Sequence, residues 1–394
     1  MTQNAPQMGA GIRDVAQLAG VSTSTVSRVL NGKTGSVSIS PATVERVQRA
    51  AQQLRYRPNP WARSMRTAQT RTIGVITFDL SHPFAAELLQ AISFACRARD
   101  YHLLVGTAEH DSSEGWMLSE ILSADRVDGV ILIGDTLLHI SGQEDRFSEA
   151  MSRFIQVHTH VITVGSRPSV AGELSIIVDD AAGATLAMEH LVSLGHRRIA
   201  HVRDGYHADS WEDKQRRQAY RSFLTAQGIP NDPVLEMAVG SRDLQAAQQV
   251  LKLLLGLPHP PTAMFVNNDA TAITMLKAAL LSGVRVPEDL SLVGFDDIAF
   301  AALCTPGLTT IRQPIDMMGS HAAKLLLDTI DGLQSTDTQQ EADRTTIFAP
   351  TLVLRESCAP PRDRREAETT LSLDGHTATT PPIGMGYSFT TQGE

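Results

Sequence analysis

Short apolar runs alternate with amphipathic helical segments over most of this 394-residue chain, from Ile73 onward. The runs are IGVIT, HLLVGT, GVILIG, VITVG, SIIVD, RIAHV, AMFV and LVGF, and helical segments such as 84–99 and 270–282 lie between them. Because a helix between two strands carries the chain back to start the next strand in the same direction, this pattern predicts parallel, doubly wound α/β sheets. About 280 residues of such a pattern are too many for one sheet, so we expect two lobes.

A different pattern, with helices only, precedes these runs. Apolar residues recur at helical spacing over 12–19, and Gly20 can adopt the left-handed conformation that ends a helix. Ser22 can then cap a second helix over 23–30, and Pro41 starts a third helix that closes a small core. Two short helices joined by a three-residue turn are typical of a helix-turn-helix.

The charge of the chain is unevenly distributed. Its net charge is −9, yet residues 1–72 contain ten Lys and Arg residues against two acidic ones. A compact basic module on an acidic body attracts phosphate locally, while the body limits non-specific binding. The distribution therefore favours a nucleic-acid partner for the N-terminal helices.

Side chains at the start of the second helix of a helix-turn-helix reach base edges in the major groove. In this chain they are Thr23 and Ser24, with Arg28 one turn further on, where it can bond guanine bidentately. The hydroxyls of Thr25 and Ser27 suit phosphate oxygens, which fix register without carrying sequence information. We therefore expect sequence-specific binding of double-stranded DNA.

Cysteine usage and hydropathy exclude other classes of protein. Cys96, Cys304 and Cys358 are odd in number and far apart, so neither a disulfide framework nor a CxxC metal site is expected, and a reducing cytoplasm fits best. The first residues lack the pattern of a signal peptide, and no stretch is apolar enough to span a membrane. We expect no metal, no cofactor and no membrane partner.

Enzyme alternatives rest on two weak features. The motifs GxGxxG, GxxxxGK[ST], HExxH and GxSxG are absent. Asp296 and Asp297 could form a catalytic carboxylate pair, but adjacent strand residues point to opposite faces. His158 and His160 could bind a metal, but a third ligand is missing. We therefore expect no enzymatic activity.

Polar residues that follow two of the apolar runs predict a binding crevice. Asn268 comes directly after the run AMFVN, and Asp296 comes directly after SLVGF. Ligands of doubly wound folds bind at the carboxyl ends of the strands. Such a pair offers donors and acceptors to hydroxyl groups. A free solute-binding protein of a transport system could carry the same crevice, but it would have a signal peptide and no helix-turn-helix.

The segments IRDVAQLAGVSTSTVSRVLNG and VERVQRAAQQLRYRPN resemble the headpiece of the lactose repressor (LacI/GalR) family, and the resemblance continues through FDLSHPF, RVDGVILIG, VDDAAGATLAMEHLVSLGHRRIAHV, VNNDATA, VPEDLSLVGFDDI, PGLTTIRQP and LVLRES. It implies a homodimer, a near-palindromic operator and a sensor shaped like periplasmic sugar-binding proteins. Arg216 occupies the position of the family's effector-binding arginine, and Phe84, Ser210 and Glu212 are expected to shape the pocket. The sequence departs from the family at Gly11, where a Thr or Ser would cap the first helix better.

The segment 59–67 resembles the family's hinge helix, whose apolar wedge enters the minor groove, and Met65 has the wedge position. The remaining DNA-binding residues expected from the resemblance are Asn31 and Arg66. After residue 356 the chain is rich in Thr and Pro and lacks the leucine heptads of a tetramerising coiled coil, so a dimer is favoured.

These observations predict an α+α/β protein: a small all-helical helix-turn-helix headpiece followed by a periplasmic-binding-protein-like sensor of two doubly wound parallel α/β lobes. We expect a transcription regulator, a repressor, whose operator affinity is controlled by a small polyhydroxylated, sugar-like effector. Inducing and corepressing effectors both remain open. The expected domains are a disordered start (1–10), the headpiece (11–57), the hinge helix and linker (58–71), lobe one (72–177 and 314–341), lobe two (178–313 and 342–356) and a disordered tail (357–394).

Overall fold

The structure is a computed structural model, and it describes residues 11–30, 39–56, 69–77, 79–107, 127–134, 160–166, 174–205, 208, 210–240, 242–333 and 344–362. Three of the predicted DNA-binding residues, Asn31, Met65 and Arg66, lie outside these ranges.

Three helices form the N-terminal unit, as predicted: α1 (Ile12–Ala19), α2 (Thr23–Leu30) and α3 (Pro41–Gln53). Gly20 ends α1 in the left-handed conformation with φ 64°, and the Ser22 hydroxyl accepts a hydrogen bond from the Thr25 amide at 3.2 Å. Although Gly11 has no side chain to cap α1, its own amide donates to the Asp14 carboxylate at 2.8 Å. The small core consists of Val15, Ala16, Ala19, Val26, Val47, Ala50 and Ala51.

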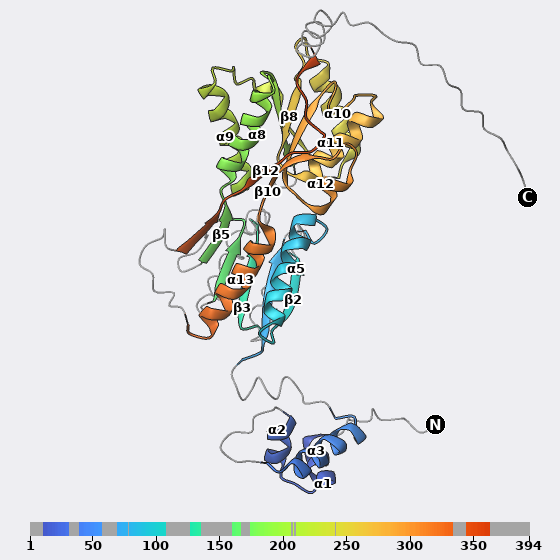
Figure 1. Cartoon of the computed structure of the whole chain (residues 1–394), viewed down its shortest axis with the longest axis vertical. Coiled ribbons are helices and arrows are strands. Elements are labelled where there is room, and N and C mark those ends of the chain that lie inside the picture. Colours follow the sequence, from blue (N-terminus) through green and yellow to red (C-terminus); the bar gives the residue numbers. More distant parts are fainter. Residues whose placement is uncertain are drawn as a thin grey trace, which may run out of the picture.

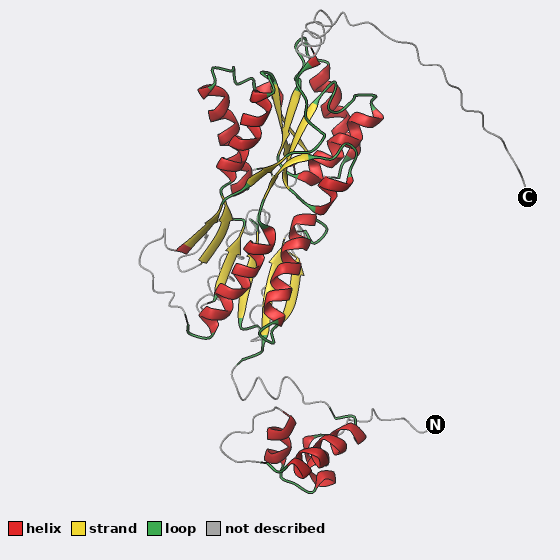
Figure 2. Cartoon of the chain, viewed as in Figure 1, coloured by secondary structure: helices red, strands yellow, loops and turns green. Residues whose placement is uncertain are grey.

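The first lobe is built on a fully parallel sheet of order β11-β5-β4-β3-β1-β2 (Figures 1 and 2). Helices α5 and α13 pack against each other beside it, and their apolar faces cover the buried strands. The elements of this lobe are β1 (Thr72–Thr77), α5 (Pro83–Arg97), β2 (His102–Thr107), β3 (Gly129–Ile133), β4 (Val161–Val164), β5 (Leu174–Val178), α13 (Ile315–Ile330) and β11 (Thr345–Phe348).

The second lobe has a sheet of order β12-β10-β9-β8-β6-β7, in which only β12 runs antiparallel to its neighbour. Figure 1 shows α8 and α9 on one face of this sheet and α10 and α11 on the other, each pair over its own apolar core. The elements are α8 (Asp180–Ser193), β6 (Ile199–Asp204), α9 (Trp211–Ala226), the 3₁₀ turn η2 (Pro233–Leu235), β7 (Glu236–Val239), α10 (Leu244–Leu255), β8 (Ala263–Val266), α11 (Asp269–Leu281), β9 (Ser291–Asp296), α12 (Ala299–Leu303), β10 (Thr309–Arg312) and β12 (Thr351–Val353). The predicted fold class is confirmed.

The chain crosses between the lobes three times: between β5 and α8, between β10 and α13, and between β11 and β12. The last crossing corrects a predicted boundary. We assigned 342–356 to lobe two, but β11 pairs with β5 in the first sheet, from Thr345 opposite Ser175 to Phe348 opposite Val178. Only the residues after β11 belong to the second lobe.

The predicted disordered tail also begins too early. Ser357 is fully buried; its hydroxyl donates to the Leu292 carbonyl at 2.6 Å and accepts from the Thr309 amide at 2.8 Å. The carbonyl of Ala359 accepts from the Ser291 hydroxyl at 2.9 Å. Residues 357–362 therefore complete the second lobe through polar and backbone contacts, which a count of apolar residues does not detect.

Candidate functional site

Helix α2 presents the side chains that were predicted to read DNA. Thr23, Ser24 and Arg28 are exposed, whereas Val26 is fully buried in the core of the three-helix unit. Ser24 and Arg28 are four residues apart and thus share one face of the helix. No acidic residue occurs in α2, so its surface and the positive end of its dipole both favour an anionic partner.

The hydroxyls at the start of α2 form a local network. Ser22 bonds the hydroxyl of Ser24 at 2.7 Å and that of Thr25 at 2.9 Å. Ser27 is half-buried on the same short helix. The hydroxyls therefore have defined positions before any ligand is bound.

A cleft of about 770 Å³, open solvent at its mouth included, lies between the two lobes. Five of the six predicted effector residues line it: Phe84, Glu212, Arg216, Asn268 and Asp296. The sixth, Ser210, does not. It is fully buried, and its hydroxyl accepts a hydrogen bond from the Asp213 amide at 3.3 Å, so it caps α9.

Arg216 is held in the cleft on three sides. Its Nε and Nη2 both lie 2.8 Å from one carboxylate oxygen of Asp180, and its Nη1 donates to the Asn267 carbonyl at 2.5 Å. The guanidinium carbon lies 3.6 Å from the centre of the Phe295 ring. Burial opposes the charge, but the carboxylates of Asp180, Asp296 and Glu212 outweigh it and raise the pKa of Arg216. A rigid cation with N–H groups left over thus faces the cleft.

Asp296, at the end of β9, supplies an acceptor on the same second-lobe side of the cleft as Arg216. Its Oδ1 accepts a hydrogen bond from Gln313 Nε2 at 2.7 Å. Burial raises the pKa of Asp296 to about 7, although Arg216 and Gln313 both favour its ionised form. Near neutral pH this carboxyl group can therefore accept or donate a hydrogen bond.

Asn268 lines the cleft but also has a structural role. Its side-chain oxygen accepts from the Thr271 amide at 2.8 Å and caps α11, while its nitrogen donates to Asp204 at 2.8 Å. One N–H and one lone pair remain for a ligand. Asn268 is consequently held in one orientation.

Several cleft residues were not predicted. Asp79, His82, Asp180 and Gln313 line the cleft together with the predicted set. Asp180 begins α8 directly after one crossing between the lobes, and Gln313 lies in another, so their contacts depend on residues far away in the sequence. Only their position next to strand ends, in SIIVDD and TTIRQ, could have indicated them.

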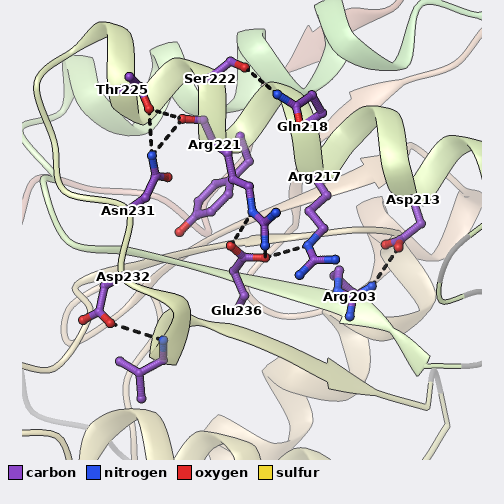
Figure 3. A network of polar contacts seen from close by, with 12 residues as sticks. Arg203, Asp213, Arg217, Gln218, Arg221, Ser222, Thr225, Asn231, Asp232 and Glu236 are labelled. Carbon is purple, nitrogen blue, oxygen red and sulfur yellow. Dashed lines mark hydrogen bonds and ion pairs between the residues drawn. The ribbon is translucent and has the colours of Figure 1, made fainter.

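Figure 3 shows the ion pairs that attach α9 to the neighbouring strands. Arg217 and Arg221 each donate to the carboxylate of Glu236 at 2.7 Å, and Arg203 pairs with Asp213 at 2.8 Å. Burial alone would raise the pKa of Glu236, but the bonds from the two arginines outweigh it and lower the pKa. This network holds the helix that presents Glu212 and Arg216 to the cleft.

The enzyme alternatives find no support in this geometry. The Asp297 carboxylate binds Arg312 and Arg355 at 2.6 Å each and does not line the cleft, so it forms no pair with Asp296. His158 lies outside the described residues. Among the residues that are described, no three His, Cys, Asp or Glu side chains could share a metal ion, and no helix is long and apolar enough to cross a membrane.

Comparison with known proteins covers both parts of the chain. Residues 11–59 match the family model of bacterial regulatory proteins of the lacI family, and residues 188–358 match that of the periplasmic binding protein-like domain. The chain is 34% identical to the ribose operon repressor of Escherichia coli over 86% of this chain and 98% of that protein. It is 32% identical to the HTH-type transcriptional regulator GalS of Salmonella typhimurium over 88% of this chain and 96% of that protein.

Solved structures give the same result. The lac repressor dimer bound to operator and the anti-inducer ONPF has a TM-score of 0.71 at 26% identity, covering 89% of this chain and all (100%) of that one. The transcriptional regulator CelR in complex with cellobiose has a TM-score of 0.63 at 28% identity, covering 88% and 99%. The headpiece and the sensor match transcription regulators together, so the chain is not a free solute-binding protein. The matching family consists of regulators, which confirms the prediction that the chain is not an enzyme. The chain belongs to the LacI family of transcription regulators, with a helix-turn-helix headpiece and a periplasmic-binding-protein-like sensor.

Proposed function

We propose that this regulator is a homodimeric repressor that acts in the cytoplasm, binds a near-palindromic operator, and changes its operator affinity when a neutral, sugar-like molecule fills the cleft. The observation that carries the proposal is the buried polar pair of Arg216 and Asp296 in the cleft of a chain that also carries a DNA-binding headpiece. Neutral polyols have many hydroxyls and little apolar surface, so a site for them must supply donors and acceptors in fixed positions.

The charge of the cleft argues against an anionic effector. Carboxylates of Asp79, Asp180, Glu212 and Asp296 line it, and of the residues that the structure describes in its lining, Arg216 is the only arginine or lysine. A phosphate ester would approach these carboxylates, and the guanidinium of Arg216 is already shared with Asp180. Two similar proteins support the sugar class: CelR was solved with cellobiose, and a LacI family regulator of Enterococcus faecium was solved with bound ribose.

Calorimetry and thermal unfolding of the full chain test the effector class. A panel of neutral sugars that includes D-ribose and cellobiose is compared with D-ribose 5-phosphate as the matched anionic control. We expect at least one neutral sugar to bind and, at 100 times its dissociation constant, to stabilise the protein by about 2.7 kcal/mol. Stabilisation by the phosphate ester but by no neutral sugar would contradict the proposal.

The proposed dimer uses an exposed apolar patch formed by Phe94, Phe300 and Leu303. These side chains are 81%, 59% and 75% exposed, and apolar side chains that gather on one face are typical of an interaction surface. Glu87, two turns before Phe94 on α5, accepts a hydrogen bond from the Ala299 amide at 3.0 Å, so α5 and α12 adjoin. A second copy of the chain is the occupant we propose, because a two-fold dimer presents two headpieces to the two halves of a palindrome.

We therefore expect Leu303→Asp and Phe94→Asp to shift the protein from dimer to monomer in sedimentation equilibrium. Leu253→Asp is the control, since Leu253 is 61% exposed but belongs to α10, outside the patch. A wild-type monomer, or a dimer that survives both substitutions, would show that this patch is not the interface.

In the headpiece we assign base contacts to Thr23, Ser24 and Arg28, and phosphate contacts to Thr25 and Ser27. Thr23, Ser24 and Arg28 are exposed and Thr25 and Ser27 are half-buried on one short helix without acidic residues, which supports this assignment. The roles of Asn31, Met65 and Arg66 remain predictions from sequence.

A further inference from the structure

The turn that follows β9 has an unusual backbone. Asp296 has φ 119° and Asp297 has φ 59°, and both are L-residues with a Cβ. Such conformations are unfavourable for residues with a Cβ and persist where the surroundings hold them. The turn carries the cleft carboxylate of Asp296, so whatever holds the turn also positions that carboxylate.

Asp297 is bound from two sides. Its Oδ2 accepts from Arg312 Nε at 2.6 Å, and its Oδ1 accepts from Arg355 Nη2 at 2.6 Å, while only 5% of its side chain is exposed. Arg355 also donates to the Leu308 carbonyl at 2.7 Å, which fixes its guanidinium in turn. Both charge-assisted bonds are of the short and strong kind.

Ile298, the residue after Asp296 and Asp297, is also held in place. The fully buried carboxylate of Asp269 accepts from the Ile298 amide at 3.0 Å and from the Thr310 hydroxyl at 2.6 Å. Asp269 approaches β9 so closely that a Cβ on Gly294 would lie 2.2 Å from its Oδ1. The backbone on the far side of the turn is thus fixed independently of Asp297.

The partners of the two aspartates are consecutive in the sequence. Arg312, the last residue of β10, binds Asp297, and Gln313 binds Asp296. Gln313 lies in the crossing from β10 to α13, and Arg355 follows the crossing from β11 to β12. The turn is therefore attached, through Gln313, to one of the three segments that join the lobes and, through Arg355, to the chain just after β12.

We propose that Asp297 is a positioning residue that, by binding Arg312 and Arg355, holds the Asp296 carboxylate in the cleft beside Gln313. It touches no effector itself. The consequence for ligand binding rests on the proposed function of the cleft, whereas the placement of Asp296 does not.

A ligand-free crystal structure of Asp297→Ala tests the placement. We expect Asp296 to leave the left-handed region and its carboxylate to separate from Gln313 Nε2. Asp289→Ala is the matched control, because it also removes a carboxylate bound by an arginine, Arg285 at 2.5 Å, and should leave Asp296 in place. An unmoved Asp296 in Asp297→Ala would overturn the proposal. If that variant does not fold, Arg355→Gln replaces it with the same two outcomes.

A double-mutant cycle of Asp297→Ala and Asp296→Asn, with the affinities for D-ribose and cellobiose measured by calorimetry, supplies a second readout. For whichever sugar binds the wild type, Asp297→Ala should weaken binding about 10-fold, but it should cause no further loss in an Asp296→Asn background, because Asp297 acts through Asp296. Equal losses in both backgrounds would indicate a general structural effect and contradict the positioning role. If neither of these nor any other neutral sugar of the panel binds the wild type, the proposed effector class fails, and the crystal structure still decides the role of Asp297.

Discussion

Arg216→Ala should destabilise the sensor by about 3–5 kcal/mol and abolish its response to sugars, because it leaves the Asp180 carboxylate buried without its counter-charge. Asp180 and Arg216 are 4% and 5% exposed, so the carboxylate that remains is poorly hydrated. Denaturant unfolding of the full chain measures the loss, and the thermal shift with D-ribose and cellobiose measures the response.

A double variant separates the two effects. In Arg216→Met with Asp180→Leu, neither charge remains, and much of the lost stability should return because replacing a buried ion pair by apolar residues is often close to neutral. The response to sugar should stay absent, since the donors of Arg216 are still missing. A single variant that is as stable as the wild type, or that keeps the sugar response, would contradict the role assigned to Arg216.

Arg28→Ala should weaken binding to the specific operator by about 1–3 kcal/mol and leave binding to random duplex DNA nearly unchanged, because one bidentate base contact has about that value. Competition binding against both DNAs at one fixed salt concentration measures the difference. Arg49→Ala is the control: Arg49 is an exposed headpiece cation on α3, but it pairs with Glu45 at 2.6 Å and lies outside the reading helix. Equal losses on operator and random DNA would show that Arg28 contacts phosphate.

Local patterns were sufficient to predict much of the fold. The left-handed Gly20, the capping Ser22 and the initiating Pro41 place the three headpiece helices, because each acts on its own neighbours. The eight apolar runs are all strands; seven of them are largely buried, and buried parallel strands are continuously apolar, whereas β2 is a half-exposed edge strand. The strands β7, β10, β11 and β12 were not predicted, because they are short, rich in Thr or half-exposed, and their stability comes from partners distant in the sequence.

The residues of the cleft, too, were predicted only where the signal is local in the sequence. Asn268 and Asp296 were predicted because residues at the carboxyl ends of parallel strands line the crevice whatever the rest of the fold does. Asp180 and Gln313 were not, because their roles depend on the Arg216 and Asp296 side chains 36 and 17 residues away. We assigned Ser210 to the cleft from the sequence because a serine before a helix can be either a ligand residue or a helix cap. In this structure it caps α9.

The most direct measurement of the central claim is selection of bound duplexes from a random DNA pool by the full chain, with and without the sugar that binds it. We expect one near-palindromic sequence to be enriched, and the sugar to change the affinity for it. Because the two binding events are linked, operator DNA should change the affinity for the sugar by the same factor. Enrichment of no sequence, or an operator affinity that the bound sugar leaves unchanged, would contradict the account.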